Sequence, residues 1–176
     1  MEAVRMPLRM KPVGFIRGGT RDSPVFGAYL VWRFAQGYAR TKVEGPSLLH
    51  FFPALSIVLD SSFSAEITRA RSLAEFAYAF YDSAGKVAKS LGGLGERIME
   101  LRDWVLDSMR VAIATRLVAI EPETARLVPV LRQEKPGTRK LARKFKECEG
   151  LRAERLGEVF ARTDERDIPY YLGVRY

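Results

Sequence analysis

The fold of this chain is decided by residues 22–38, DSPVFGAYLVWRFAQGY, a stretch that is apolar on nearly every side. Ser23 is a favoured N-cap residue, and Pro24 suits the first position of a helix. Beyond Pro24 only Arg33 and Gln36 are clearly polar. A helix with so little polar surface is covered by neighbours on most sides. The stretch therefore predicts a central core helix, against which the rest of the chain packs.

Three further segments have the pattern of helices. The apolar run Leu48–Leu59 follows Ser47, a favoured cap, and Pro53 within it predicts either a kink or a late first turn. Residues 65–90 repeat small and aromatic side chains at helical spacing. After a glycine-rich break at residues 91–95, a second long stripe recurs every three or four positions, at Ile98, Leu101, Val105, Met109, Ala112 and Ile113. Five or so helices are therefore expected before residue 116.

The pattern changes at residues 116–131. Two short aliphatic runs, 116–120 and 126–131, flank the turn Glu121-Pro-Glu-Thr124, which is typical of a β-hairpin. Pro129 lacks a backbone N–H, so the second strand is expected at an edge. In a winged helix-turn-helix, helices are followed along the chain by a hairpin, and this chain has the same order of elements. We therefore predict a mainly α fold with one β-hairpin, arranged as a winged-helix-like helical domain.

Two or three helices are expected after the hairpin. The first starts at the cap Thr138, has Leu141, Phe145 and Cys148 on its apolar face, and is interrupted at Gly150. The last helix holds Leu156, Val159 and Phe160, and the apolar side chains of residues 164–176 dock on the core. The predicted organisation is an N-terminal arm at residues 1–21, broken by prolines and glycines, and a single mainly helical domain at residues 22–176.

The chain offers few residues for catalysis. It has one histidine and one cysteine among 176 residues. His50 lies in an apolar run and is interpreted as a packed residue, and Cys148 as a small core residue. No Cys/His set has the spacing of a zinc site, and the glycines at 92–95 lack the preceding strand of a phosphate loop. We expect no catalytic residue, no metal and no cofactor.

Pairs of carboxylates leave one alternative open. Asp103 with Asp107, and Glu96 with Glu100, stand four positions apart and are interleaved with arginines, which is typical of a solvated helix face. A two-carboxylate hydrolase would need such a pair in a cleft. Nothing in the sequence favours that arrangement beyond the presence of the carboxylates.

Cysteine usage and hydropathy indicate a compartment. A lone cysteine cannot form an internal disulfide and suits a reducing environment. The longest apolar run, Leu48–Leu59, is too short to cross a bilayer. We therefore expect a soluble, cytoplasmic protein that does not enter a membrane.

The formal charge of +8 is unevenly distributed. Residues 22–131 are balanced, whereas residues 132–146, here called the basic segment, hold seven cations against Glu134. These candidate binding residues are Arg132, Lys135, Arg139, Lys140, Arg143, Lys144 and Lys146. Such a segment can bind the backbone of nucleic acid or an acidic protein, or can simply be solvated. No base-reading motif is present, so backbone contact is favoured over sequence-specific recognition.

Two stretches resemble the middle component of prokaryotic ABC-three-component systems, which are related to Lamassu-type defence. One is residues 22–38, quoted above. The other is AERLGEVFART at residues 153–163, followed by YLGV at residues 171–174. The hairpin run LVAI at residues 117–120 and the run Leu48–Leu59 lie between them in the order of that family. The resemblance covers most of the chain.

The resemblance implies a function. A middle component is expected to be a non-enzymatic adaptor in a hetero-oligomer, linking a coiled-coil ABC ATPase of the SMC type to an effector such as a nuclease in antiviral defence. DNA-backbone contact by the basic segment fits this role. The family has no catalytic motif to carry over. The alternative is a free-standing winged-helix DNA-binding transcriptional regulator, which would prefer one operator sequence.

Overall fold

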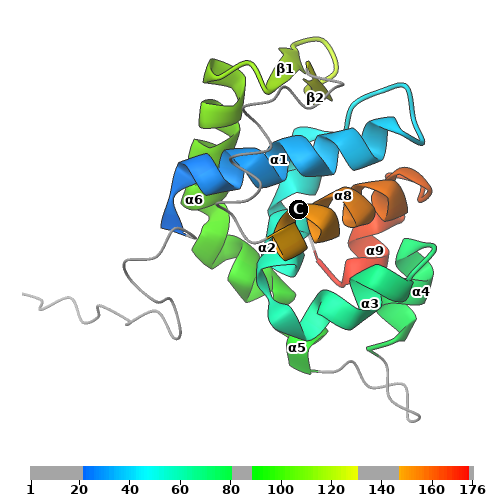
Figure 1. Cartoon of the computed structure of the whole chain (residues 1–176). Coiled ribbons are helices and arrows are strands. Elements are labelled where there is room, and N and C mark those ends of the chain that lie inside the picture. The colour runs from blue at the N-terminus through cyan, green and yellow to red at the C-terminus, as the bar shows by residue number, and fades with distance from the viewer. Residues whose placement is uncertain (1–21, 81–88, 131–146, 175–176) are drawn as a thin grey trace, which may run out of the picture.

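A computed structural model describes residues 22–80, 89–130 and 147–174 of the chain (Figure 1). The first elements are α1 (Pro24–Ala39), the 3-10 turn η2 (Leu48–His50), α2 (Phe51–Leu59), the 3-10 turn η3 (Ser61–Phe63), α3 (Ser64–Arg69), α4 (Leu73–Tyr78), α5 (Lys89–Gly92) and α6 (Leu94–Ala114). They are followed by β1 (Val118–Glu121), β2 (Arg126–Pro129), α8 (Glu147–Ala161) and α9 (Ile168–Leu172). The predicted mainly helical fold with one β-hairpin is confirmed.

Helix α1 is the buried core helix that its sequence predicts. The Ser23 hydroxyl accepts from the backbone N–H of Val25 at 3.3 Å, and Pro24 occupies the first turn. Leu30, Phe34 and most other apolar side chains of α1 have almost no exposed surface. The helix packs between α6 and α8, which cover its two sides (Figure 1).

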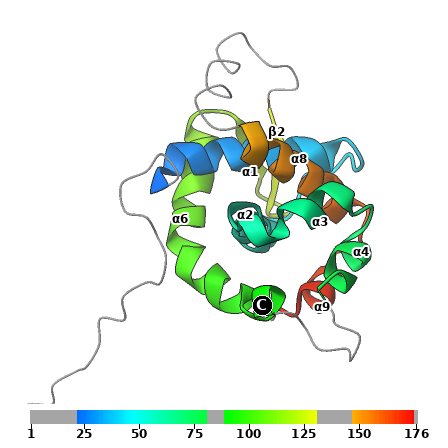
Figure 2. The same ribbon diagram turned by 60° about the horizontal axis from the view of Figure 1, so that its bottom comes forward.

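Helix α2 lies inside the ring formed by the other helices (Figure 2). Pro53 is in the first turn of α2, directly after η2, so the late-first-turn alternative is correct. Because Pro53 stands in the first turn, its missing N–H costs no helical hydrogen bond. No single described helix is long and apolar enough to cross a bilayer; only Leu48–Leu59 together with Ser61–Arg69, bent by 88°, reaches that length and composition.

Helices α1 and α8 approach each other through two glycines. A Cβ added at Gly37 would lie 1.8 Å from the carbonyl oxygen of Glu154, and one added at Gly157 would lie 2.2 Å from that of Phe34. No real side chain tolerates such contacts, so only glycine allows this backbone separation. The close approach fixes how α8 is placed against the core helix.

The segment 65–90 is less continuous than its spacing predicts. Among its described residues, α3 ends at Arg69, Ala70 is extended, and α4 begins after the cap Ser72. The long stripe of the next helix is confirmed, because α6 buries Leu101, Val105, Met109 and Ala112 and half-buries the other two members.

The hairpin forms where it is predicted. Strands β1 and β2 pair antiparallel, with Ala119 opposite Val128. The narrower prediction of a winged helix is not confirmed. Strand β2 also forms a bridge from Arg126 to Ser47, and the Leu127 N–H donates to the Pro46 carbonyl at 3.0 Å. The hairpin is thereby attached to the body of the fold along β2.

Two predictions for the C-terminal part are wrong. Helix α8 continues through Gly150, where the missing side chain makes room for the ring of Tyr29. Cys148 is exposed rather than buried. Helix α8 turns Leu156 and Phe160 toward the core, and at about 100° per residue Cys148 falls on another side.

The remaining predictions for this part have mixed outcomes. In α9, Ile168 and Leu172 dock on the core as predicted, whereas Tyr170 is 80% exposed. The arm at residues 1–21 and the predicted helix from Thr138, with Leu141 and Phe145, lie outside the described residues.

Candidate functional site

The predicted binding residues are not among those that the structure describes. Arg132, Lys135, Arg139, Lys140, Arg143, Lys144 and Lys146 all fall in the gap between residues 130 and 147. Their role therefore stays a prediction. Candidate sites have to be built from the described helices and the hairpin.

His50 is enclosed by aromatic rings, as its apolar surroundings predict. Its side chain lies 6.1 Å from Tyr38 and 6.0 Å from Phe160, measured between ring centroids, and only 4% of the residue is exposed. Burial, assisted by the charges of Arg126 and Lys42, lowers its pKa to about 4, although Glu165 opposes this shift. Its Nδ1 is buried without a hydrogen-bond partner. His50 is therefore neutral at pH 7 and shielded from any external substrate.

A polar junction next to His50 joins the hairpin to the body. Arg126 donates to both carboxylate oxygens of Glu165, at 2.7 and 3.0 Å, and to the carbonyl of Gly45 at 2.8 Å. The hydroxyl of Tyr38 donates to Glu165 at 3.0 Å. Hydrogen bonds from Arg126 lower the pKa of Glu165, and burial raises that of Tyr38. The junction consists of mutually satisfied groups and holds four segments together.

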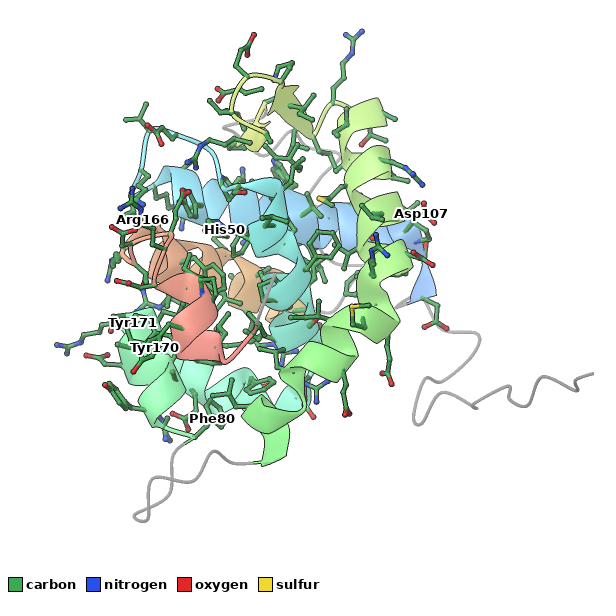
Figure 3. The ribbon with its side chains drawn as sticks, turned by 180° about the vertical axis from the view of Figure 1, so that it is seen from behind. His50, Phe80, Asp107, Arg166, Tyr170 and Tyr171 are labelled. Atoms are coloured by element: carbon green, nitrogen blue, oxygen red, sulfur yellow. The ribbon has the colours of Figure 1, made fainter. Side chains whose placement is uncertain are left out.

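The carboxylate pairs of α6 lie on an exposed helix face and not in a cleft. Glu96, Glu100, Asp103 and Asp107 are exposed, and Asp107 forms an ion pair with Arg110 at 2.8 Å. Figure 3 shows Asp107 on the outer side of α6, away from His50. Within the described ranges, no three His, Cys, Asp or Glu side chains stand close enough to hold a metal ion. The solvated-face interpretation of these carboxylates is supported.

Ion pairs orient α8 against α1. Glu154, which is almost fully buried, pairs with Arg33 of α1 and with Arg40, the residue that caps the C-terminal end of α1. Arg40 also reaches Glu158 at 3.3 Å, and Glu158 accepts from Arg155 at 2.8 Å. Buried carboxylates need such partners, because an unpaired charge inside a protein is costly. Together with the glycine contacts, this network determines which side of α8 remains uncovered.

Helices α3 and α8 lie side by side (Figure 2). The uncovered side of α8 lines a groove with η3 and α3, here called the α3–α8 groove. Its volume is about 590 Å³. One wall consists of Ser61 from η3 and of Ser64, Ile67 and Thr68 from α3, and the α8 wall consists of Cys148, Leu151, Arg152 and Arg155. Leu151 is 59% exposed although it lies beside the hollow. The groove is the candidate interaction surface of the described part of the chain.

Hydrogen bonds hold the two walls in place. Arg152 donates to the Ser64 hydroxyl and pairs with Glu149 at 3.6 Å. Arg155 donates to the carbonyl of Ala70 at 3.0 Å, where α3 has ended. The arginines of α8 thus span the gap to α3, so the groove is preformed.

The sequence analysis missed these residues. One signal was available: Leu151 stands 140° around a helix from Leu156, off the stripe that continues to Val159 and Phe160. The opposing wall could not be found in this way, because α3 and α8 are separated by about 80 residues.

Residues 21–176 match the family model of the ABC-three component (ABC-3C) system Middle Component 3, and the chain belongs to this family. No curated protein and no solved structure matches the chain. The resemblance drawn from residues 22–38 and 153–174 is thereby confirmed at the level of the family.

Proposed function

We propose that the chain is the non-enzymatic adaptor of its system and links a coiled-coil ABC ATPase to an effector such as a nuclease in prokaryotic defence. The observation that carries this proposal is the match to a middle-component family over residues 21–176. The enclosure of His50 supports it, since that side chain cannot reach a substrate. Hydrolysis of ATP and of nucleic acid then belongs to the other components.

Co-purification tests the adaptor role. The tagged chain is expressed together with the other two components of its system, and the eluate is analysed by size-exclusion chromatography with light scattering. We expect one assembly that contains all three chains. Separate elution of this chain would contradict the proposal, as would turnover of ATP or DNA by the purified chain that His50→Ala abolishes.

The distribution of charge supports a contact with the DNA backbone. The described residues hold 15 basic and 18 acidic side chains, whereas the whole chain holds 29 and 21. The other segments therefore carry 14 cations and three carboxylates, and seven of those cations belong to the basic segment. Clustered cations bind phosphates by releasing counterions, independently of base sequence.

A salt series tests the DNA contact. Binding of the full chain to a random-sequence duplex is measured by fluorescence anisotropy at several salt concentrations. Replacing Arg139, Lys140, Arg143 and Lys144 by alanine should lower the slope of log K against log salt by about four, near 0.9 for each phosphate lost. Arg102→Ala on the exposed face of α6 is the control. An unchanged slope contradicts the contact, and tight binding to one operator favours the winged-helix regulator.

A further inference from the structure

We propose that the α3–α8 groove binds an amphipathic helix from another component of the system, and that a carboxylate on this helix lies against Arg152 and Arg155. The inference rests on the adaptor function proposed above and adds the surface and the chemistry of the partner. It follows from the exposed apolar wall, the spacing of the lining residues and the charge of the groove.

The α8 wall exposes apolar surface that nothing in the described chain covers. Leu151 is 59% exposed and Cys148 is also exposed, whereas Ala153, Leu156 and Phe160 further along α8 are buried. Ile67, at the bottom of the groove, has no exposed surface. An exposed leucine that borders a hollow of about 590 Å³ gains far more from a partner than one on a flat surface.

The lining residues follow the repeat of a helix on both walls. Ser61, Ser64 and Thr68 stand at positions i, i+3 and i+7, and Cys148, Leu151 and Arg155 repeat this spacing. The row on α8 therefore runs along one helix for two turns, or about 10 Å, and the opposite row passes from η3 into α3. A third helix that lies between two such rows can insert side chains at the same spacing, which is the helix-in-groove mode of recognition.

The charge of the groove selects the partner helix. Both ionised residues that line it, Arg152 and Arg155, are cations. Glu149 pairs with Arg152 at 3.6 Å and Glu158 pairs with Arg155 at 2.8 Å, but neither carboxylate lines the groove. A carboxylate on the incoming helix would complete this arrangement, and a lysine or arginine there would be repelled.

A second copy of this chain is a poorer occupant. A symmetric contact between two copies through this groove would bring together the same face of α8 from each copy. That arrangement would place Arg152 and Arg155 against their own equivalents. Like charges at the centre of an interface disfavour association. The occupant is therefore assigned to a different component.

Cys148 allows a direct test, because it is the one cysteine of the chain and lines the groove. Its rate of modification by a 5-kDa polyethylene-glycol maleimide is measured in the isolated full chain and in the co-purified assembly. We expect modification to be at least tenfold slower in the assembly. A thiol that stays equally reactive in an intact assembly overturns the inference while leaving the adaptor function untouched.

The rate of Cys148 modification in the isolated chain distinguishes the other possible occupants of the groove. Protection that increases with the concentration of the chain alone would assign the groove to a second copy. Protection at every concentration would assign it to a segment of the same chain. Either result overturns the inference. If the components do not assemble at all, the proposed function fails, and that outcome is visible before any thiol is modified.

Substitutions test the chemistry of the partner. Leu151→Asp should weaken assembly at least tenfold, whereas Met99→Asp on α6, where Met99 is 68% exposed, is the matched control and should not. Ser61→Glu should weaken assembly and Ser61→Lys should not, because only glutamate repels a carboxylate. Thermal unfolding of the isolated variants separates an effect on folding from an effect on assembly. Equal effects of both Ser61 variants would contradict the carboxylate, and an assembly insensitive to Leu151→Asp would contradict the groove.

Discussion

Arg126 and Glu165, 39 residues apart, meet in a two-fold hydrogen bond of 2.7 and 3.0 Å between guanidinium and carboxylate. The pair joins the hairpin to the turn that follows α8, and Tyr38 adds a hydrogen bond from α1. A bidentate arginine–carboxylate pair of this kind fixes the relative orientation of the two groups as well as stabilising their contact. The pair therefore helps to orient β2 on the body, together with the backbone hydrogen bond from Leu127 to Pro46.

Removing the charge of Glu165 should loosen the hairpin. Glu165→Gln removes the anion that accepts two hydrogen bonds from Arg126 and leaves the longer ion pair with Glu44 at 3.7 Å. We expect a loss of about 1.5 kcal/mol in the free energy of unfolding. Chemical denaturation measures this loss, and hydrogen exchange of the β1 and β2 amides locates it. Glu123→Gln in the exposed turn is the control. Equal stability of the two variants would show that the pair contributes nothing.

The same pair should make stability depend on acid. Because the pKa of Glu165 is lower in the folded state than in the unfolded chain, its contribution is complete above the ordinary range of a glutamate. It is lost as the pH falls through that range and below. Denaturation at pH 7 and at pH 3 should therefore show a smaller difference for Glu165→Gln than for the unmodified chain.

His50 should cause a second loss of stability as the pH falls, in a higher pH range than the loss from Glu165. Its folded pKa is about 4, against 6.5 in the unfolded chain, so only the unfolded chain takes up a proton between these values. The contribution is complete above pH 6.5, and about 3 kcal/mol is lost by pH 4. His50→Leu should flatten this part of the profile. A variant that loses stability as steeply as the unmodified chain would show that another group titrates there.

Adding one methyl group between α1 and α8 should be costly. Gly157→Ala places a Cβ 2.2 Å from the Phe34 carbonyl, so the helices must separate, at a cost of about 3 kcal/mol. Thermal unfolding measures the effect. Gly95→Ala is the matched control, since no atom lies within 4 Å of the added Cβ. A neutral Gly157→Ala would mean that α8 can shift away from α1 without loss.

The end of α6 offers a stabilising change. Arg116 has a φ of 58°, its N–H donates to Ile113, and the N–H of Leu117 donates to Ala112. This is the Schellman arrangement, which favours glycine at the left-handed position. Arg116→Gly should therefore raise the free energy of unfolding by about 0.5–1 kcal/mol. Arg110→Gly within α6 should lower the free energy of unfolding by about 1 kcal/mol. If both variants changed stability in the same direction, the Schellman arrangement at Arg116 would be contradicted.

The break between α3 and α4 shows why one part of the sequence prediction was too simple. The helical spacing of residues 65–90 continues through Ala70 and Arg71. In the structure, Arg155 donates to the carbonyl of Ala70 and Arg162 to that of Arg71, at 3.0 and 3.4 Å. These donors come from α8 and from the residue directly after it, 85 and 91 residues later. Tertiary hydrogen bonds therefore satisfy the carbonyls where the helix is interrupted.

The sequence by itself determined the core helix, the apolar faces of α2 and α6, the hairpin and the family. Caps such as Ser23, turn residues such as Pro122 and the spacing of apolar side chains act within a few positions, so they can be recognised locally. Only the tertiary structure decided that α8 runs through Gly150, that Cys148 and Leu151 stay uncovered, and that Arg126 meets Glu165. These features depend on how distant segments dock, and the identity of a residue does not reveal which neighbour removes it from water.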